Sequence, residues 1–275
     1  MERRKFFQIG MAAVAGAVVS AGRAQAVGTG GFRFLVVNDL HYHDAECAPW
    51  FAAAFDAMRA SAPDATFCLV AGDLANDGKP DQLEAMSRVL KTAAFPCHAV
   101  PGNHDWTTAG DRSAYDKFFP AAGNSGFDHA GWRVIGLDTT ENTGWQNTRI
   151  SAETLRWLDD HLAAGDPARP LILFTHFPLG RGVKFRPANA DELLARLAGH
   201  NLRAAFSGHW HGFTGWEDEG VCFTTNRCCS RYRDNHDGTP EKGWFVCEAR
   251  DGNVSRRFVE LPPELRTSGL SKAQA

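Results

Sequence analysis

The sequence predicts an α/β sandwich, in which two sheets pack face to face and helices cover their outer faces. Two patterns lead to this prediction. Between residues 32 and 206, short apolar runs alternate with segments of helical periodicity, and between residues 213 and 259 the apolar period falls towards two. The chain has 275 residues, 44% of them hydrophobic, which is enough for one large core. We therefore expect a single domain over residues 27–261, without internal repeats.

The expected elements follow in order along the chain. An apolar run at residues 32–37 follows two glycines and should be the first core strand. Aromatic and methionine side chains at helical spacing then predict a helix over residues 48–60, and Ser151 should cap a later helix. Further strands are expected at residues 66–70, 96–100, 126–129, 132–137, 170–174 and 202–206, and further helices at residues 81–90, 114–119, 152–162 and 189–198. Residues 262–275 are expected to be a disordered tail.

Polar side chains stand where five of the apolar runs end. They are Asp39 and His41, then Asp73, then Asn103 with His104 and Asp105, then His176, and finally His209 with His211. Five strand ends would bring these carboxylate, amide and imidazole groups to one edge of a sheet. Mixed nitrogen and oxygen ligands suit Mn, Fe, Zn or Co better than Ca, which prefers an all-oxygen shell. The pattern therefore predicts a metal site.

The order of these blocks resembles the calcineurin-like metallophosphoesterase family. The resemblance runs from residue 32 to about residue 259. Segments 72–78 and 101–105 are most similar to the branch that includes class III cyclic-nucleotide phosphodiesterases and glycerophosphodiesterases. It implies a four-layer α/β/β/α sandwich of two mixed sheets. It also implies hydrolysis of a small-molecule phosphate ester by two divalent ions about 3.5 to 4 Å apart and a bridging hydroxide.

The resemblance further implies a role for each polar residue. Asp73 would bridge the two ions. Six other residues would complete the ligand sets, namely Asp39, His41 and His211 for one ion and Asn103, His176 and His209 for the other. His104 would donate to a phosphate oxygen or protonate the leaving group, and Asp105 would orient His104.

Two positions depart from the patterns of relatives. The purple acid phosphatase branch binds ferric iron through a tyrosine three residues after the bridging aspartate, where this chain has Asn76. We therefore expect no iron–tyrosinate colour. Phe177 follows His176 where many relatives have a second histidine, which alters the pocket wall.

The motifs leave the reaction open between related alternatives. A phosphodiesterase and a phosphomonoesterase need the same metals, and the similarity of segment 72–78 favours the diesterase. A non-catalytic module that binds metal or a phosphorylated partner is a third possibility, although it would need neither His104 nor Asp105. Arg181 and Arg186 are candidates for contacting the substrate, with a solvated basic loop as the alternative. Trp145 is a candidate for stacking on a base, with core packing as the alternative.

The first 26 residues have the features of an export signal. A basic start at Arg3 and Arg4 is followed by an apolar run at residues 9–20 and a small-residue cleavage pattern that ends at Ala26. The arginine pair resembles the twin-arginine signal, which implies passage through the twin-arginine translocation machinery to the periplasm or beyond. An ordinary secretory signal is the alternative, and the run is too short for a membrane anchor. Cleavage would change the formal charge from −3 to −6, which gives no attraction to nucleic acid.

Seven cysteines, an odd number, leave at least one thiol unpaired. Cys68 and Cys97 lie in apolar runs and should be small buried hydrophobes. The C-terminal group favours a disulfide in an exported protein, without indicating which cysteines pair. A structural zinc is the alternative, although the C-x-x-C spacing is missing. That group consists of Cys222, Cys228, Cys229 and Cys247.

Overall fold

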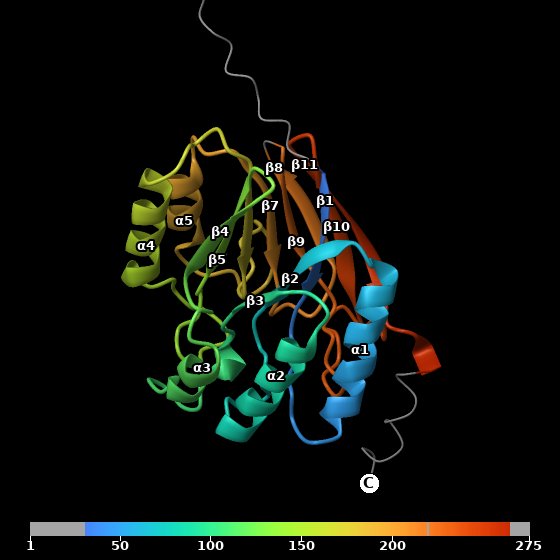
Figure 1. Ribbon diagram of the computed structural model, residues 1–275. Coiled ribbons are helices and arrows are strands. Elements are labelled where there is room, and N and C mark those ends of the chain that lie inside the picture. Colours follow the sequence, from blue (N-terminus) through green and yellow to red (C-terminus); the bar gives the residue numbers. More distant parts are fainter. Residues whose placement is uncertain (1–30, 219, 265–275) are drawn as a thin grey trace, which may run out of the picture.

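The computed structural model describes residues 31–218 and 220–264. The expected signal segment, residues 1–26, and most of the expected tail lie outside the described residues. Two mixed sheets pack face to face, and helices cover the outer face of each (Figure 1). The predicted four-layer fold class is thereby confirmed. In the described part of the chain, no helix has the length and apolar character needed to cross a membrane.

The first sheet has five strands in the order β11-β10-β1-β2-β3. Its strands are β1 (Phe32–Val37), β2 (Ala65–Ala71), β3 (Cys97–Val100), β10 (Gly243–Arg250) and β11 (Asn253–Glu260). β1, β2 and β3 run parallel, because helices α1 (Cys47–Ser61) and α2 (Pro80–Thr92) make the crossovers between them. Helix α3 (Ser113–Phe118) lies beside α2 on the same side of the molecule (Figure 1).

The second sheet has six strands in the order β4-β5-β6-β7-β9-β8. Its strands are β4 (Ser125–His129), β5 (Trp132–Leu137), β6 (Leu171–Thr175), β7 (Leu202–Ser207), β8 (Thr214–Asp218) and β9 (Val221–Thr225). Helices α4 (Ala152–Ala163) and α5 (Ala190–Leu197) cover its outer face. The predicted cap of α4 is confirmed, since the Ser151 side chain accepts a hydrogen bond from the Thr154 backbone amide.

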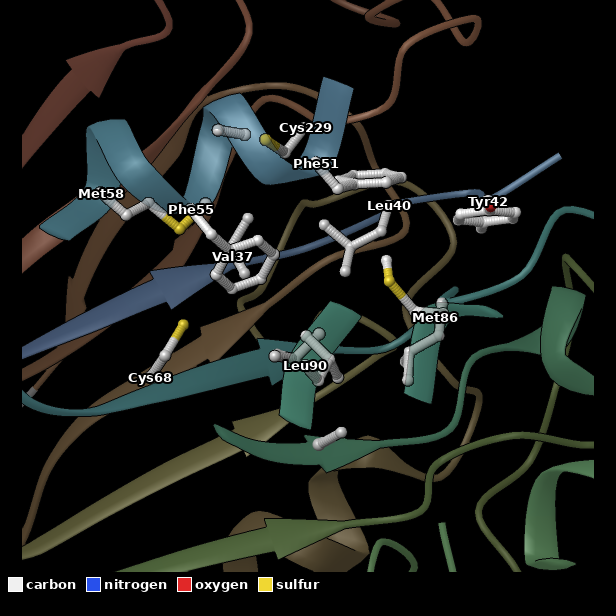
Figure 2. Packing of buried hydrophobic residues seen from close by; sticks show 14 of the residues in the cluster. Val37, Leu40, Tyr42, Phe51, Phe55, Met58, Cys68, Met86, Leu90 and Cys229 are labelled. Atoms are coloured by element: carbon white, nitrogen blue, oxygen red, sulfur yellow. The ribbon is translucent and has the colours of Figure 1, made fainter. Parts of the chain in front are cut away.

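The central strands are buried on both faces, which explains why they appear as continuous apolar runs in the sequence. Phe34 of β1 faces the second sheet, where its ring lies 5.9 Å from that of Phe206. Val37, farther along the same strand, belongs to the cluster on the helix side, where Phe55 and Met58 of α1 pack over the sheet (Figure 2). Side-chain alternation along one strand therefore joins three layers.

The two C-terminal hairpins divide between the sheets. β8 and β9 pair antiparallel, and β9 adds to the second sheet parallel to β7. β10 and β11 also pair antiparallel, but β10 joins the first sheet beside β1. The predicted antiparallel end is confirmed, and the segment that links the two hairpins, residues 226–242, has to pass from one sheet to the other.

Candidate metal centre

The predicted ligands all lie just beyond the carboxyl ends of strands. They are Asp39 and His41 after β1, Asp73 after β2, Asn103 after β3, His176 after β6, and His209 and His211 after β7. Each is buried, with no more than 8% of its surface exposed. The structure therefore brings together seven residues that are spread over more than 170 positions of the sequence.

The backbone turns sharply where these ligands leave their strands. Five of them have a positive φ, which is uncommon for residues other than glycine. They are Asp39 (53°), His41 (47°), Asp73 (52°), His209 (64°) and His211 (43°). Backbone strain of this kind gathers at functional sites, where the surrounding structure maintains it. At this site it serves to aim neighbouring ligands of one strand end at the same point.

Two glycines of the motifs are required because their Cα atoms lie close to ligand side chains. A Cβ on Gly72, whose φ is +82°, would lie 2.4 Å from Nδ1 of His176. A Cβ on Gly102 would lie 2.0 Å from Oδ1 of Asp73. Both distances are far below van der Waals contact, so these positions let the backbone approach the ligands.

The first group of ligand atoms is formed by Asp39, His41, Asp73 and His211. Nε2 of His211 lies 3.1 Å from Oδ1 of Asp39 and 3.2 Å from Nε2 of His41. Nε2 of His41 lies 3.5 Å from Oδ2 of Asp73. Two ring nitrogens and two carboxylates thus face a common point, with all ligand atoms within 4.8 Å of one another.

The second group shares Asp73 with the first and adds His176 and His209. Nε2 of His176 lies 3.4 Å from Oδ1 of Asp73 and 3.2 Å from Nδ1 of His209. The predicted amide ligand is also in place, with Oδ1 of Asn103 lying 3.1 Å from Nε2 of His176. The Asp73 carboxylate therefore offers Oδ2 to one group and Oδ1 to the other.

Backbone carbonyls fix the orientation of three of the imidazoles. A carbonyl can only accept, so the ring nitrogen that contacts it must carry the proton. These bonds run from His176 Nδ1 to Ala71 (3.0 Å), from His209 Nε2 to Trp145 (2.7 Å) and from His211 Nδ1 to Asp234 (3.1 Å). The other nitrogen of each ring then faces the centre, as in metal-binding histidines.

The charges of the groups also suit a cation. Burial disfavours the charged form of Asp73, yet the imidazoles of His176, His104 and His41 lower its pKa to about 2. Burial, followed by the charge of His176, lowers the pKa of His209 to about 3. At neutral pH Asp73 is therefore ionised and His209 is neutral, which are the forms that bind metal. Burial disfavours the charged form of His211, but the adjacent Asp39 carboxylate raises the pKa of this imidazole well above its usual value. The donor set fits a divalent transition metal.

The structure places His104 beside the ligands, and the Asp105 carboxylate bonds to the backbone of the neighbouring turns. Nδ1 of His104 donates to the carbonyl of Asn76 at 2.7 Å. The Asp105 carboxylate instead accepts from the backbone amides of Ala75 and Gly102, both at 2.8 Å. Asp105 therefore fastens the turn after β3, which carries His104, to the end of β2, and its role in orienting the His104 ring stays a prediction.

A cavity of about 220 Å³ opens beside the ligand groups. Four residues from loops complete its wall, namely Trp145, Phe185, Arg233 and His236. Trp145 was a stacking candidate and has 53% of its surface exposed. No motif marks the other three, because they lie in loops whose path depends on the whole fold.

Arg181 and Arg186, the substrate candidates from the sequence, do not line this cavity. Nη2 of Arg186 lies 2.6 Å from Oδ1 of Asp191, and Nε of Arg181 lies 3.9 Å from the same oxygen. The structure therefore places both guanidinium groups beside the Asp191 carboxylate, in the first turn of α5.

All seven cysteines carry free thiols in this structure. Cys68 is fully buried in β2, as expected, and Cys97 lies beside it in β3 with partial exposure. Cys228 lies 3.0 Å from Nζ of Lys242. Across residues 31–218 and 220–264, no group of potential metal ligands includes a cysteine, so the C-terminal cysteines form neither a disulfide nor a zinc site here.

Curated phosphodiesterases are similar to this chain in sequence. A probable cyclic nucleotide phosphodiesterase of Rhodopseudomonas palustris is 30% identical over 210 residues, which cover 66% of this chain and 74% of that protein. A 3′,5′-cyclic adenosine monophosphate phosphodiesterase of Escherichia coli is 26% identical over 251 residues, which cover 83% of this chain and 90% of that protein.

The fold also matches that of a solved phosphatase. A purple acid phosphatase from yellow lupin seeds superposes with a TM-score of 0.62 at 14% identity, over 84% of this chain and 52% of that one. The model of the family described as calcineurin-like phosphoesterase matches residues 32–213, a range that contains all seven predicted ligands. The chain belongs to the calcineurin-like phosphoesterase family and is a hydrolase of phosphate esters.

Proposed function

We propose that this chain hydrolyses small phosphate diesters, with cyclic nucleotides as the first candidates, and that it does so with two divalent ions. The observation that carries the proposal is the position of Asp73. Its two carboxylate oxygens face two separate groups of ligand atoms, 3.5 Å from His41 and 3.4 Å from His176. One carboxylate shared between two ions is the arrangement that in-line displacement at phosphorus uses.

Each of the two groups of ligand atoms would hold one ion. Asp39, His41 and His211 would serve one ion and Asn103, His176 and His209 the other, with Asp73 common to both. Mn, Fe, Zn and Co all suit this donor set. When bound, such ions supply Lewis-acid activation of the phosphate ester and of a water molecule.

His104 would supply the proton that the reaction needs. Its Nδ1 is committed to the carbonyl of Asn76, so Nε2 is the atom left to act on a substrate. The ring lies 4.8 Å from that of His41, at the edge of the first ligand group. From there Nε2 can donate to a phosphoryl oxygen or to the departing oxygen.

The wall of the cavity supports a diester with a planar group. The rings of Trp145 and Phe185 lie 5.7 Å apart, and Phe185 packs edge-on against His209 at 5.1 Å. An ester group with an aromatic part, such as a nucleoside, can stack on such a wall while its phosphate lies at the ligands. The names of the relatives point to the same substrate class.

The test is hydrolysis of bis(p-nitrophenyl) phosphate beside p-nitrophenyl phosphate, before and after chelation and with Mn or Zn restored. We expect chelator-sensitive turnover that is faster on the diester. Faster turnover of the monoester would make the protein a phosphomonoesterase. Metal-loaded protein that turns over neither ester nor any cyclic nucleotide would contradict the proposal.

We further propose that the protein is exported with its metals bound. The support is the sequence of the first 26 residues, with Arg3 and Arg4 before an apolar run and Ala26 after it. Replacing both arginines by lysine should prevent export. The amount of protein in the cytoplasmic and periplasmic cell fractions measures this, and the double variant should remain in the cytoplasm. Unchanged export of that double variant would favour the ordinary secretory route.

A further inference from the structure

One cation in the cavity wall has no part in the proposed metal centre. Arg233 belongs to the segment between β9 and β10 and lines the cavity together with His104 and Asp73. Among the described residues, no carboxylate lies within ion-pair distance of its guanidinium group, whereas Arg227 and Arg231 of the same segment both have acidic partners. A guanidinium group that lies beside a phosphate site and has no carboxylate partner is available to bind an anionic ligand.

Hydrogen bonds aim the guanidinium group at the substrate space. Nε of Arg233 donates to Oδ1 of Asn76 at 2.9 Å, which fixes one edge of the group. Nη2 lies 3.4 Å from Nδ1 of His104. That nitrogen already carries the proton it donates to the carbonyl of Asn76, so it cannot accept from Arg233. The N–H groups of Nη2 are therefore left for a ligand that sits beside His104.

The backbone of Arg233 is fastened by buried groups. Its amide donates to Oγ of Ser230 at 3.1 Å, and its carbonyl accepts from Nζ of Lys242 and from Sγ of Cys228. Lys242 is only 8% exposed. A buried ammonium group is costly unless it is well partnered, so its use as an anchor for this loop indicates that the position of the loop matters.

The same loop is linked to the ligand groups. Asp234, the next residue, offers the carbonyl that accepts from Nδ1 of His211 at 3.1 Å. Arg233 is thus fixed relative to one ligand through its neighbour and relative to His104 through Asn76. Asn76 therefore holds both Arg233 and His104. It is the position at which purple acid phosphatases have the iron-binding tyrosine.

We propose that Arg233 binds a non-bridging oxygen of the substrate phosphoryl group, and the same oxygen of a phosphate product, with Asn76 as its positioning residue. The inference rests on the proposed function, since it places the phosphoryl group between the ligand groups and His104. The fork of guanidinium N–H groups matches phosphate oxygens in geometry and charge. The ligand class is therefore an anionic phosphate or phosphate ester.

The test is the affinity of Mn-loaded protein for inorganic phosphate, measured by calorimetry, because this readout does not require turnover. Arg233→Met is expected to weaken phosphate binding by about 10- to 100-fold, the loss typical of a charge-assisted hydrogen bond. Arg181→Met is the matched control, because Arg181 lies outside the cavity. The phosphate affinity of this variant should equal that of the unaltered protein. Metal content is measured in each variant.

Arg233→Ala with millimolar guanidinium ion separates a binding role from a structural one. If Arg233 binds phosphate, the free ion should restore part of the lost affinity, whereas it would not mend a displaced loop. Phosphate affinity within about twofold of the unaltered protein in Arg233→Met, at equal metal content, would overturn the proposal. If Arg233→Met loses metal, an Arg233→Ala protein that does not respond to guanidinium overturns it instead.

The outcome is separable from that of the proposed function. Protein that fails to hydrolyse any diester contradicts the function, while the phosphate measurement still decides the role of Arg233. Asn76→Ala, which frees Nε of Arg233, should weaken phosphate binding less than Arg233→Met does. Equal or greater loss in Asn76→Ala at full metal content would mean that Asn76, and not Arg233, holds the phosphate.

Discussion

At the scale of single residues, the centre depends on one carboxylate that two groups of ligands share. We predict that Asp73→Ala loses both ions and that its diester hydrolysis falls to the level of the chelated protein, because Oδ1 and Oδ2 belong to different ligand groups. Metal content and hydrolysis are measured together. Asp77→Ala is the matched control, since Asp77 lies four residues away and pairs with Lys79. An Asp73→Ala protein that keeps its metal and activity would contradict this assignment.

Gly102 lies close to the Asp73 side chain but has an unstrained backbone, so a substitution there tests the effect of close approach alone. Its φ is −109°, which any residue can adopt, yet a Cβ there would lie 2.0 Å from Oδ1 of Asp73. We predict that Gly102→Ala displaces the carboxylate and lowers kcat/KM by about 100-fold, the usual consequence of a misplacement near 1 Å. Gly123→Ala should leave kcat/KM unchanged, because nothing lies within 4 Å of its Cβ position. Equal kcat/KM values for the two variants would refute the explanation.

Single residues also show where sequence reasoning was incomplete. The ligands could be predicted, because each follows a strand within a short block. The contacts of Asp105 could not, since its partners Ala75 and Gly102 are set by the packing of two turns. Arg233 was missed for a similar reason. It lies in a loop without a motif, and nothing in the sequence places that loop beside His104.

At the scale of elements, each strand of the centre ends in a tight turn that presents its ligands. The positive φ values of Asp39, Asp73 and His209 follow directly on β1, β2 and β7. Apolar runs predicted the strands, but a run of apolar residues does not predict the φ of the residue after it. The strain persists because the packed sheets and helices hold the strand ends in place.

Helix α4 was predicted together with its N-cap. Because the cap is not part of the candidate metal centre, a substitution there tests stability separately from activity. We predict that Ser151→Ala lowers the free energy of unfolding by about 1 kcal/mol, because the backbone amide of Thr154 loses its acceptor. The melting temperature should fall by roughly 2–4 °C with no change in kcat/KM. Ser151→Thr, which keeps the hydroxyl, should lie close to the unaltered protein. A loss as large in Ser151→Thr as in Ser151→Ala would exclude the cap as the cause.

At the scale of the whole molecule, the ligands join the two sheets. Asp39 and Asp73 follow strands of the first sheet, whereas His176 and His211 follow strands of the second. Ions bound between them would therefore connect the two halves of the sandwich at one edge. Binding to the folded state alone stabilises a protein by mass action.

We predict that chelation lowers the melting temperature as well as the activity. Free metal at about 100 times its dissociation constant adds about 2.7 kcal/mol, which corresponds to a fall of roughly 5–10 °C when the metal is removed. Scanning calorimetry with and without chelator measures it. Asp73→Ala should melt at the same temperature in both conditions. A fall on chelation as large in Asp73→Ala as in the unaltered protein would show that the stabilising metal binds elsewhere.

The sequence by itself determined the fold class, the order of the elements and the seven candidate ligands. Each of these depends on local features, namely apolar periodicity and short blocks at strand ends, which can be recognised without knowing what lies nearby. Only the tertiary structure decided how the two C-terminal hairpins divide between the sheets and how loop 226–242 crosses between them. It thereby decided that Arg233 lies beside His104, because a contact between residues 129 positions apart depends on the packing of both sheets and not on either segment alone.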